Sequence, residues 1–195
     1  LARIPELGLV GCKLHPALDR FDITDTRALE FYAAAEQMRV PLDVHTGPHW
    51  WRLVDNDPLK FDEIAFRHPA LVMILEHLGG RPFFEHVLAV LGNNLPLGRP
   101  GNLYGGITSV LQRDYQRLWY LGIERIAEAI YILGEDMPVF GLDFPYNSAE
   151  QIRDDLRQLR TLPLSAEGFA KLFGGNLQRA LSGPSHTERP LAPGE

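Results

Sequence analysis

Residues 70–80 read Ala-Leu-Val-Met-Ile-Leu-Glu-His-Leu-Gly-Gly, and this stretch decides the fold. It begins as an apolar run without polar alternation, which is typical of a parallel strand covered on both faces. It ends at His77, immediately before a glycine-rich turn. Loops at the carboxyl ends of parallel strands form the site crevice of α/β proteins. A lone histidine there is usually a hydrogen-bonded core residue, so its meaning depends on how the other strands end.

The same strand ending recurs along the chain. Apolar runs end at five residues that lie 30 to 34 positions apart: His15, His45, His77, Ser109 and Asp143. Helical patterns lie between these strand ends and after the last one: Thr26–Met38, Phe61–His68, Pro82–Leu91, Asp114–Gly134, a helix capped by Ser148 and Gln151, and Ser165–Phe173. The sequence therefore predicts five successive units of strand, loop and helix.

Alternating strands and helices favour an α/β fold, built either as an open doubly wound sheet or as a (β/α)8 TIM barrel. An open-sheet nucleotide binder usually carries a glycine-rich turn after its first strand, and Leu14-His-Pro-Ala17 is not such a turn. The barrel is therefore favoured. Five units do not close an eight-stranded barrel, and the chain begins with Leu1, so we expect a partial barrel whose first three units lie upstream.

Composition narrows the class of protein. The chain has 195 residues, 45% of them hydrophobic, which suits one globular domain, expected over residues 1–181, followed by a disordered tail over 182–195. The net charge of −6 and the lack of Lys/Arg clusters argue against nucleic-acid and anionic membrane partners. A single cysteine, Cys12, and the lack of a signal peptide or bilayer-spanning run predict a cytoplasmic protein.

The strand ends carry a set of side chains suited to a metal ion. Side chains at the carboxyl ends of barrel strands converge, and His45, His77 and Asp143 offer imidazole nitrogens and a carboxylate oxygen for a divalent cation. A catalytic metal site also leaves a position for water, whose pKa the ion lowers. A further histidine beside that water can move its proton. The row therefore predicts a metal-dependent enzyme.

Five segments together resemble the amidohydrolase superfamily, in order and in spacing. They are Lys13-Leu-His-Pro16, Pro41-Leu-Asp-Val-His-Thr-Gly47, Glu76-His-Leu-Gly-Gly80, Leu133-Gly-Glu-Asp-Met-Pro-Val-Phe-Gly-Leu-Asp-Phe-Pro145 and Gly174-Gly-Asn176. The resemblance covers Leu9 to Leu181. This superfamily contains metal-dependent TIM-barrel hydrolases and non-oxidative decarboxylases, including relatives of aminocarboxymuconate-semialdehyde decarboxylase.

The resemblance implies roles for the matching residues. The five strands would be strands 4–8 of the barrel, with His45 ending the fifth as a metal ligand. His77 would contact the metal or its water, and Asp143 would bind the metal and handle the proton. The implied cofactor is a divalent ion, zinc first and manganese as the alternative. Lys13 matches a position where some members carry a carboxylated, metal-bridging lysine, although a substrate contact or a plain strand-end charge is favoured here.

Other residues are candidates for binding a small-molecule substrate. Lys13, His15, His49 and Ser109 are placed in this group, and His49 could equally belong to a loop packed on the barrel rim. Glu76 is expected to point away from the barrel interior, because neighbouring residues of a strand face opposite sides.

Three functions stay open from the sequence. The first is a metal-dependent hydrolase in which an activated water attacks a small carboxylate, lactone or amide substrate. The second is a decarboxylase that uses the same residues. The third is a non-catalytic fragment, because the family's first-strand His-x-His pair is lacking. Such a fragment could assemble as a homo-oligomer through its open sheet edges.

Overall fold

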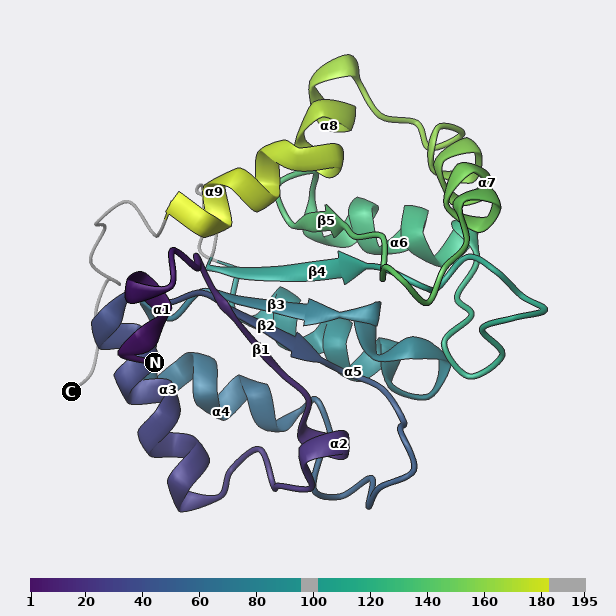
Figure 1. Ribbon diagram of the computed structural model, residues 1–195. Helices are drawn as coiled ribbons and strands as arrows, with labels where there is room; N and C mark the ends of the chain where they lie inside the picture. Colours follow the sequence, from purple (N-terminus) through teal and green to yellow (C-terminus); the bar gives the residue numbers. More distant parts are fainter. Residues whose placement is uncertain (96–101, 183–195) are drawn as a thin grey trace.

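A single parallel sheet organises the computed structural model, which describes residues 1–95 and 102–182 (Figure 1). Its five strands lie in sequence order, each beside the next: β1 (Cys12–Leu14), β2 (Leu42–His45), β3 (Met73–Glu76), β4 (Leu103–Ile107) and β5 (Pro138–Phe140). Because all neighbours are parallel, every strand ends at the same edge of the sheet. The predicted α/β class is confirmed.

Helices and short turns connect the strands. They are α1 (Arg3–Glu6), α2 (Pro16–Asp19), α3 (Thr26–Met38), α4 (Lys60–Arg67), the 3₁₀ turn η1 (His77–Gly79), α5 (Gly80–Asn93), α6 (Ile123–Leu133), α7 (Ala149–Leu159), α8 (Ala166–Ala170), the π-helical turn η2 (Lys171–Gly175) and α9 (Asn176–Ser182). Within the described part of the chain, none of these helices has the length and apolarity that crossing a bilayer requires.

One face of the sheet packs against helices to form the main core. Alternate strand residues such as Leu42, Leu75 and Ile107 point to this face and are fully buried. They belong to the same cluster as Tyr32 of α3 and Phe84 of α5. Burying large apolar side chains between a sheet and its crossover helices is the main source of stability in this architecture.

The opposite face is apolar at the amino end and polar at the carboxyl end. Near the amino end, Ile74, Tyr104 and Val139 pack with Ala180 of α9, and Arg179 Nε donates a hydrogen bond to the Tyr104 hydroxyl at 3.1 Å. Towards the carboxyl end the side chains on this face become charged or imidazole groups. The strand register places them in two successive rows, Lys13 beside Asp43 and then His45 beside Glu76.

Several predicted elements are confirmed and some boundaries are wrong. The helix Thr26–Met38 is α3 as predicted, and Ser148 with Gln151 forms the predicted capping box of α7. The predicted helix over 114–134 is shorter, because Leu121 and Gly122 turn back to donate to the Val110 carbonyl and Gly122 takes a φ of 81°. The chain is helical up to Ser182, the first residue of the predicted tail, and residues 183–195 lie outside the described residues.

Gly79 links β3 to α5, and its replacement tests how tightly this link is packed. Gly79 has a φ of 78°, and a Cβ there would lie 2.9 Å from Phe83 Cβ and 3.2 Å from the Phe84 backbone nitrogen. We expect Gly79→Ala to lower the free energy of unfolding by about 2 kcal/mol or more, from left-handed strain and overpacking. Chemical denaturation measures the change.

Gly92→Ala is the matched control. A Cβ on this helical glycine meets Leu133 Cδ2 at an ordinary 3.9 Å, so the substitution should be neutral or stabilise by about 0.5–1 kcal/mol. Equal destabilisation by the two variants would contradict the packing assigned to Gly79.

Candidate functional site

Four histidines meet at the carboxyl edge of the sheet. His15 follows β1, His45 ends β2, His49 lies in the next loop, and His77 follows β3. The rings of His15 and His45 stack with centroids 3.8 Å apart, and the rings of His45 and His77 are 4.7 Å apart. One ring nitrogen each from His15, His45 and His49 can be chosen so that all three lie within 4.8 Å of one another.

Burial and mutual repulsion keep these imidazoles neutral. Burial, together with the repulsion that a charged His45 would meet from protonated His77 or His15, lowers the pKa of His45 far below its ordinary value. Burial, with His49 and Lys13, lowers the pKa of His15 to about 4. Burial also lowers the pKa of His49 and that of His77. Neutral imidazoles carry the lone pairs that metal ligation requires.

Two ring nitrogens of this cluster are buried without a hydrogen-bond partner among the described residues, His45 Nε2 and His49 Nδ1. Leaving a buried polar atom unpaired is costly unless a ligand or water satisfies it. Nitrogens around one tetrahedral ion stand about 3.4 Å apart, so a small inward movement from 4.8 Å would bring this set into range. The unpaired nitrogens of His45 and His49 are therefore suited to bind a divalent metal ion.

Hydrogen bonds fix which nitrogen of each flanking histidine carries a proton. His77 Nδ1 lies 2.7 Å from the Thr108 carbonyl oxygen, which can only accept, so Nδ1 is protonated and Nε2 offers a lone pair. His15 is different, because its Nδ1 accepts from the Leu18 backbone N–H at 3.2 Å. The neutral ring of His15 then carries its proton on Nε2 and is a donor.

An unusual backbone turn brings His77 to this position. His77, Leu78 and Gly79 have φ values of 63°, 47° and 78°, which non-glycine residues rarely adopt. The buried Thr46 hydroxyl donates to the Glu76 carbonyl at 2.5 Å and accepts from the Gly79 N–H at 2.8 Å. Thr46 therefore links the end of β2 to both sides of the left-handed turn.

Two carboxyl groups and one amine lie on the same face as His45: Glu76 beside it, and Asp43 with Lys13 one row nearer the amino end of the sheet. Lys13 Nζ contacts Asp43 Oδ2 at 3.0 Å, and burial with Glu76 nearby raises the pKa of Asp43 to about 6. Burial also raises the pKa of Glu76, whose Oε2 has no hydrogen-bond partner among the described residues.

The expectation that Glu76 points away from the interior is wrong. The strand register pairs Glu76 with His45, and paired residues of parallel strands face the same side. The alternation of strand side chains does not extend to His77, because His77 lies in the left-handed turn, beyond the last residue of β3. A glycine on the neighbouring strand gives Glu76 its room, because a Cβ on Gly106 would lie 2.5 Å from Glu76 Cδ.

Ser109 and Asp143 form a second group at the same edge. Both follow their strands in turns, with φ values of 55° and 50°, and Ser109 Oγ donates to Asp143 Oδ2 at 2.6 Å. Asp143 contributes to the electrostatic environment of His77 and Glu76. Among the predicted site residues, His15, His49 and His77 each contact His45, Ser109 is paired with Asp143, and Lys13 is paired with Asp43.

Sequence reasoning missed several residues of this edge. Asp43 and Thr46 flank His45, and Glu76 precedes His77, so closeness to a strand-end histidine was a usable signal for them. Asn147 gave no such signal, because its contacts with Ser109 Oγ and the Leu142 carbonyl depend on the turn after β5.

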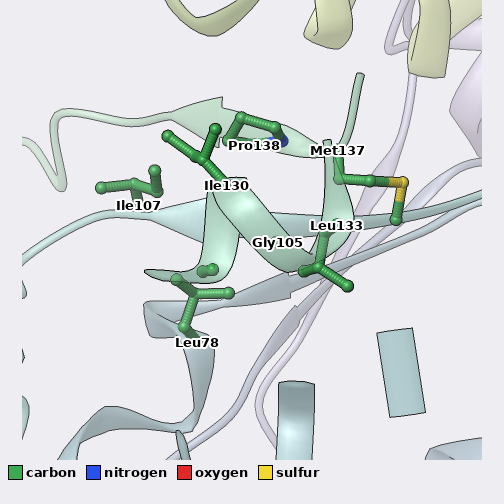
Figure 2. Close-up of a pocket in the computed structure, with 8 residues that line it drawn as sticks. Leu78, Gly105, Ile107, Ile130, Leu133, Met137 and Pro138 are labelled. Carbon is green, nitrogen blue, oxygen red and sulfur yellow. The ribbon is translucent and has the colours of Figure 1, made fainter. Parts of the chain in front are cut away.

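A separate cavity lies on the helix-covered face of the sheet, between β4, β5 and α6 (Figure 2). All of its lining residues are apolar: Leu78, Gly105, Ile107, Ala129, Ile130, Leu133, Met137 and Pro138. The histidines stand on the other face. This cavity is therefore a gap in the core packing and offers no group for chemistry.

Comparison with known proteins places this geometry in a family. A family model described as amidohydrolase matches residues 1–181. No curated protein matches the chain.

Solved structures share the fold at low sequence identity. An uncharacterised TIM-barrel protein from Bordetella bronchiseptica has a TM-score of 0.73 and 20% identity over 93% of this chain and 60% of its own. A dihydroxybenzoic acid decarboxylase from a Polaromonas species, with bound manganese and an inhibitor, has a TM-score of 0.62 and 15% identity over 92% of this chain and 63% of its own. A zinc-bound amidohydrolase from Burkholderia multivorans has a TM-score of 0.67 and 16% identity over 94% of this chain and 70% of its own. The chain thus spans about three fifths of the first two proteins.

The lowered pKa of His15 predicts a pH-dependent stability. Between about pH 6.5, the ordinary histidine pKa, and about pH 4, the unfolded chain binds more protons at this residue than the folded chain. His15 therefore costs stability progressively as the pH falls through this window, and has no such cost above it. His15→Asn keeps an acceptor for the Leu18 N–H and removes the titrating group.

We expect the free energy of unfolding of the metal-free His15→Asn variant to rise relative to that of the wild type as the pH is lowered from 7 to 4.5. Urea titrations with a chelator present measure the difference. A difference that stays constant with pH would contradict the half-buried, neutral state of His15.

Proposed function

The chain belongs to the amidohydrolase family, and from this premise we propose that it forms the catalytic edge of a metal-dependent hydrolase. The substrate would be a small molecule with a carboxylate, lactone or amide group. The observation that carries the proposal is the cluster of neutral imidazoles at the carboxyl edge of a parallel sheet, with His45 Nε2 buried and unpaired among the described residues. Zinc in one similar structure and manganese in another support a divalent ion.

We propose His45 as the central metal ligand, with Asp143 and His77 as its partners. His77 Nε2 is available because Nδ1 donates to Thr108. His15 is assigned to the substrate instead, because binding a metal through Nε2 would require a tautomer that breaks its hydrogen bond with Leu18. His49 joins His15 as a substrate contact at the rim, and Ser109 can offer a substrate only the remaining lone pair of its oxygen, because its hydroxyl donates to Asp143.

A divalent ion bound here would polarise a substrate oxygen and lower the pKa of a nearby water. The residues of the chain divide the remaining work. His15 Nε2–H donates to a substrate oxygen, Lys13 attracts a substrate carboxylate, and Asp143 takes a proton from the attacking water and returns it to the leaving group. Where His77 Nε2 faces the water instead of binding the ion, it would accept a proton, and the Nδ1–H bond to the Thr108 carbonyl keeps the ring oriented in either case.

A decarboxylase is the second candidate, because similar solved structures include 2,6-dihydroxybenzoate decarboxylase from Rhizobium and 5-carboxyvanillate decarboxylase from Sphingomonas paucimobilis. In this version the substrate loses carbon dioxide, and His77 or Asp143 protonates the carbon that it leaves. The same residues serve both reactions, so the products distinguish them.

We further propose that β1–β5 correspond to strands 4–8 of an eight-stranded barrel. Five parallel strands in sequence order, and a fold shared with 60% of a TIM-barrel protein, support this assignment. A piece that binds no metal is the competing reading. Comparing the 195-residue chain with a version extended by its upstream coding sequence distinguishes the two.

Metal analysis tests the proposed ligands. We expect the extended protein to hold stoichiometric zinc or manganese and His45→Ala to lose most of it, because His45 supplies a buried nitrogen with no other partner among the described residues. His86→Ala is the control, since His86 lies on α5 and contacts Asp57. Unchanged metal content in His45→Ala would disprove the proposed site.

Product analysis tests the reaction class. Incubation with a panel of lactones, amides and aromatic carboxylates should release acid from a lactone or amide without carbon dioxide, and Asp143→Asn should abolish this because it removes the proton acceptor. Stoichiometric release of carbon dioxide with no hydrolysis product would favour the decarboxylase instead.

A further inference from the structure

The side chain of Asp143 is held by a chain of hydrogen bonds that the proposed function does not explain. Ser109 Oγ lies 2.6 Å from Asp143 Oδ2, and Asn147 Nδ2 lies 2.9 Å from the same Ser109 oxygen. Asn147 is 7% exposed and Gln116, which approaches its other side, is also 7% exposed. Gln116 Nε2 donates to Asn147 Oδ1 at 3.2 Å.

Backbone groups at both ends of this chain fix the orientation of its two amide side chains. The Leu142 carbonyl, 3.0 Å from the Asn147 amide, can only accept, so the group facing both it and Ser109 is the NH₂. At the far end the Gln112 N–H can only donate, at 2.9 Å, so Gln116 presents its oxygen there and its nitrogen to Asn147. The two assignments agree.

The direction has a consequence for Asp143. Ser109 Oγ accepts from Asn147, and a carboxylate oxygen can only accept, so the single O–H of Ser109 donates to Asp143 Oδ2. Asp143 Oδ2 is then an acceptor, and a proton on the Asp143 carboxyl would sit on Oδ1. The Asp143 carbonyl accepts from the Tyr146 N–H at 2.8 Å, which holds the backbone of the same turn.

We propose that Asn147 and Ser109 are positioning residues that commit Asp143 Oδ2 to a hydrogen bond and present Oδ1 to the metal and the substrate. The inference rests on the proposed role of Asp143. It goes beyond that role by naming the reactive oxygen and the residues that select it. Ser109 and Asp143 both keep left-handed conformations, which persist only where the surrounding structure enforces them.

Ser109→Gly separates positioning from stability. It removes the hydroxyl, but glycine adopts the φ of 55° without strain, so the unfolding midpoint in urea should be unchanged or raised. Cobalt(II), followed by its visible absorption, is the probe for metal binding. We expect Ser109→Gly to weaken cobalt binding by about 10–100-fold, the range for losing a group that orients a metal ligand.

Arg39→Gly is the matched control. Arg39 has a φ of 55° at the carboxyl end of α3, so glycine relieves the same backbone strain away from the strand ends that carry Ser109 and Asp143. Its cobalt affinity should equal that of the wild type. A similar loss of cobalt binding in Arg39→Gly and Ser109→Gly would overturn the inference.

Asn147→Asp reverses the relay, the chain of hydrogen bonds from Asn147 through Ser109 to Asp143, with almost no change in side-chain shape. A carboxylate at position 147 has no proton to donate, so the Ser109 hydroxyl turns to it and leaves Asp143 Oδ2 without its donor. Cobalt binding should weaken as in Ser109→Gly, with a changed absorption spectrum. Wild-type binding in both variants would overturn the inference while leaving the proposed metal site intact.

A wild-type chain that binds no cobalt would count against the proposed metal function, and a double-mutant cycle would then decide the relay. In the metal-free protein, the effects of Asn147→Asp and Asp143→Ala on the urea midpoint should be non-additive, because Ser109 couples the two side chains. Additive effects would overturn the relay independently of metal.

Discussion

The hydroxyl of Thr46 holds the turn on which the whole edge depends. It donates to the Glu76 carbonyl and accepts from the Gly79 N–H, and so bridges the left-handed segment between them. Each left-handed residue costs about 1–3 kcal/mol and persists only where its surroundings enforce it. The turn puts His77 on the same side of the sheet as Glu76, although successive strand residues face opposite sides. Two ionisable side chains therefore reach the site from one strand end.

Electrostatics explain why this arrangement suits a cation. The imidazoles are buried against one another and cannot readily take a proton, so their nitrogens stay available. Asp43 and Glu76 lie on the same face as His45, and burial raises both pKa values, with Lys13 opposing the rise. A divalent ion among the nitrogens would favour the ionised form of both carboxyls. The neutral imidazole nitrogens and the nearby carboxyl groups therefore both favour a bound cation.

The sequence could predict the row of strand ends but not its local geometry. Apolar runs at nearly constant spacing locate all five strands, and helical periodicity gives α3 with the correct bounds. The predicted orientation of the Glu76 side chain was wrong because strand alternation does not extend into a turn with positive φ. That turn depends on Thr46, which follows another strand. The roles of His45, His77 and Asp143 remain predictions that the converging histidines support. The relay through Asn147 was invisible, because hydrogen bonds between separate loops leave no local pattern.

Room for the polar layer comes from small residues on neighbouring strands. A side chain on Gly106 would overlap the Glu76 carboxyl, and one on Gly141 would lie 2.4 Å from the Thr108 hydroxyl. Glu76 and His45 thus stand on strands, whereas Asp143 and Ser109 stand on the turns that follow strands. Side chains on strands are held by the sheet, but those on turns need hydrogen bonds to hold their orientation. This difference explains why the buried amides of Asn147 and Gln116 are found around Asp143. The end of β2, which carries His45, needs only the hydrogen bonds of the Thr46 hydroxyl.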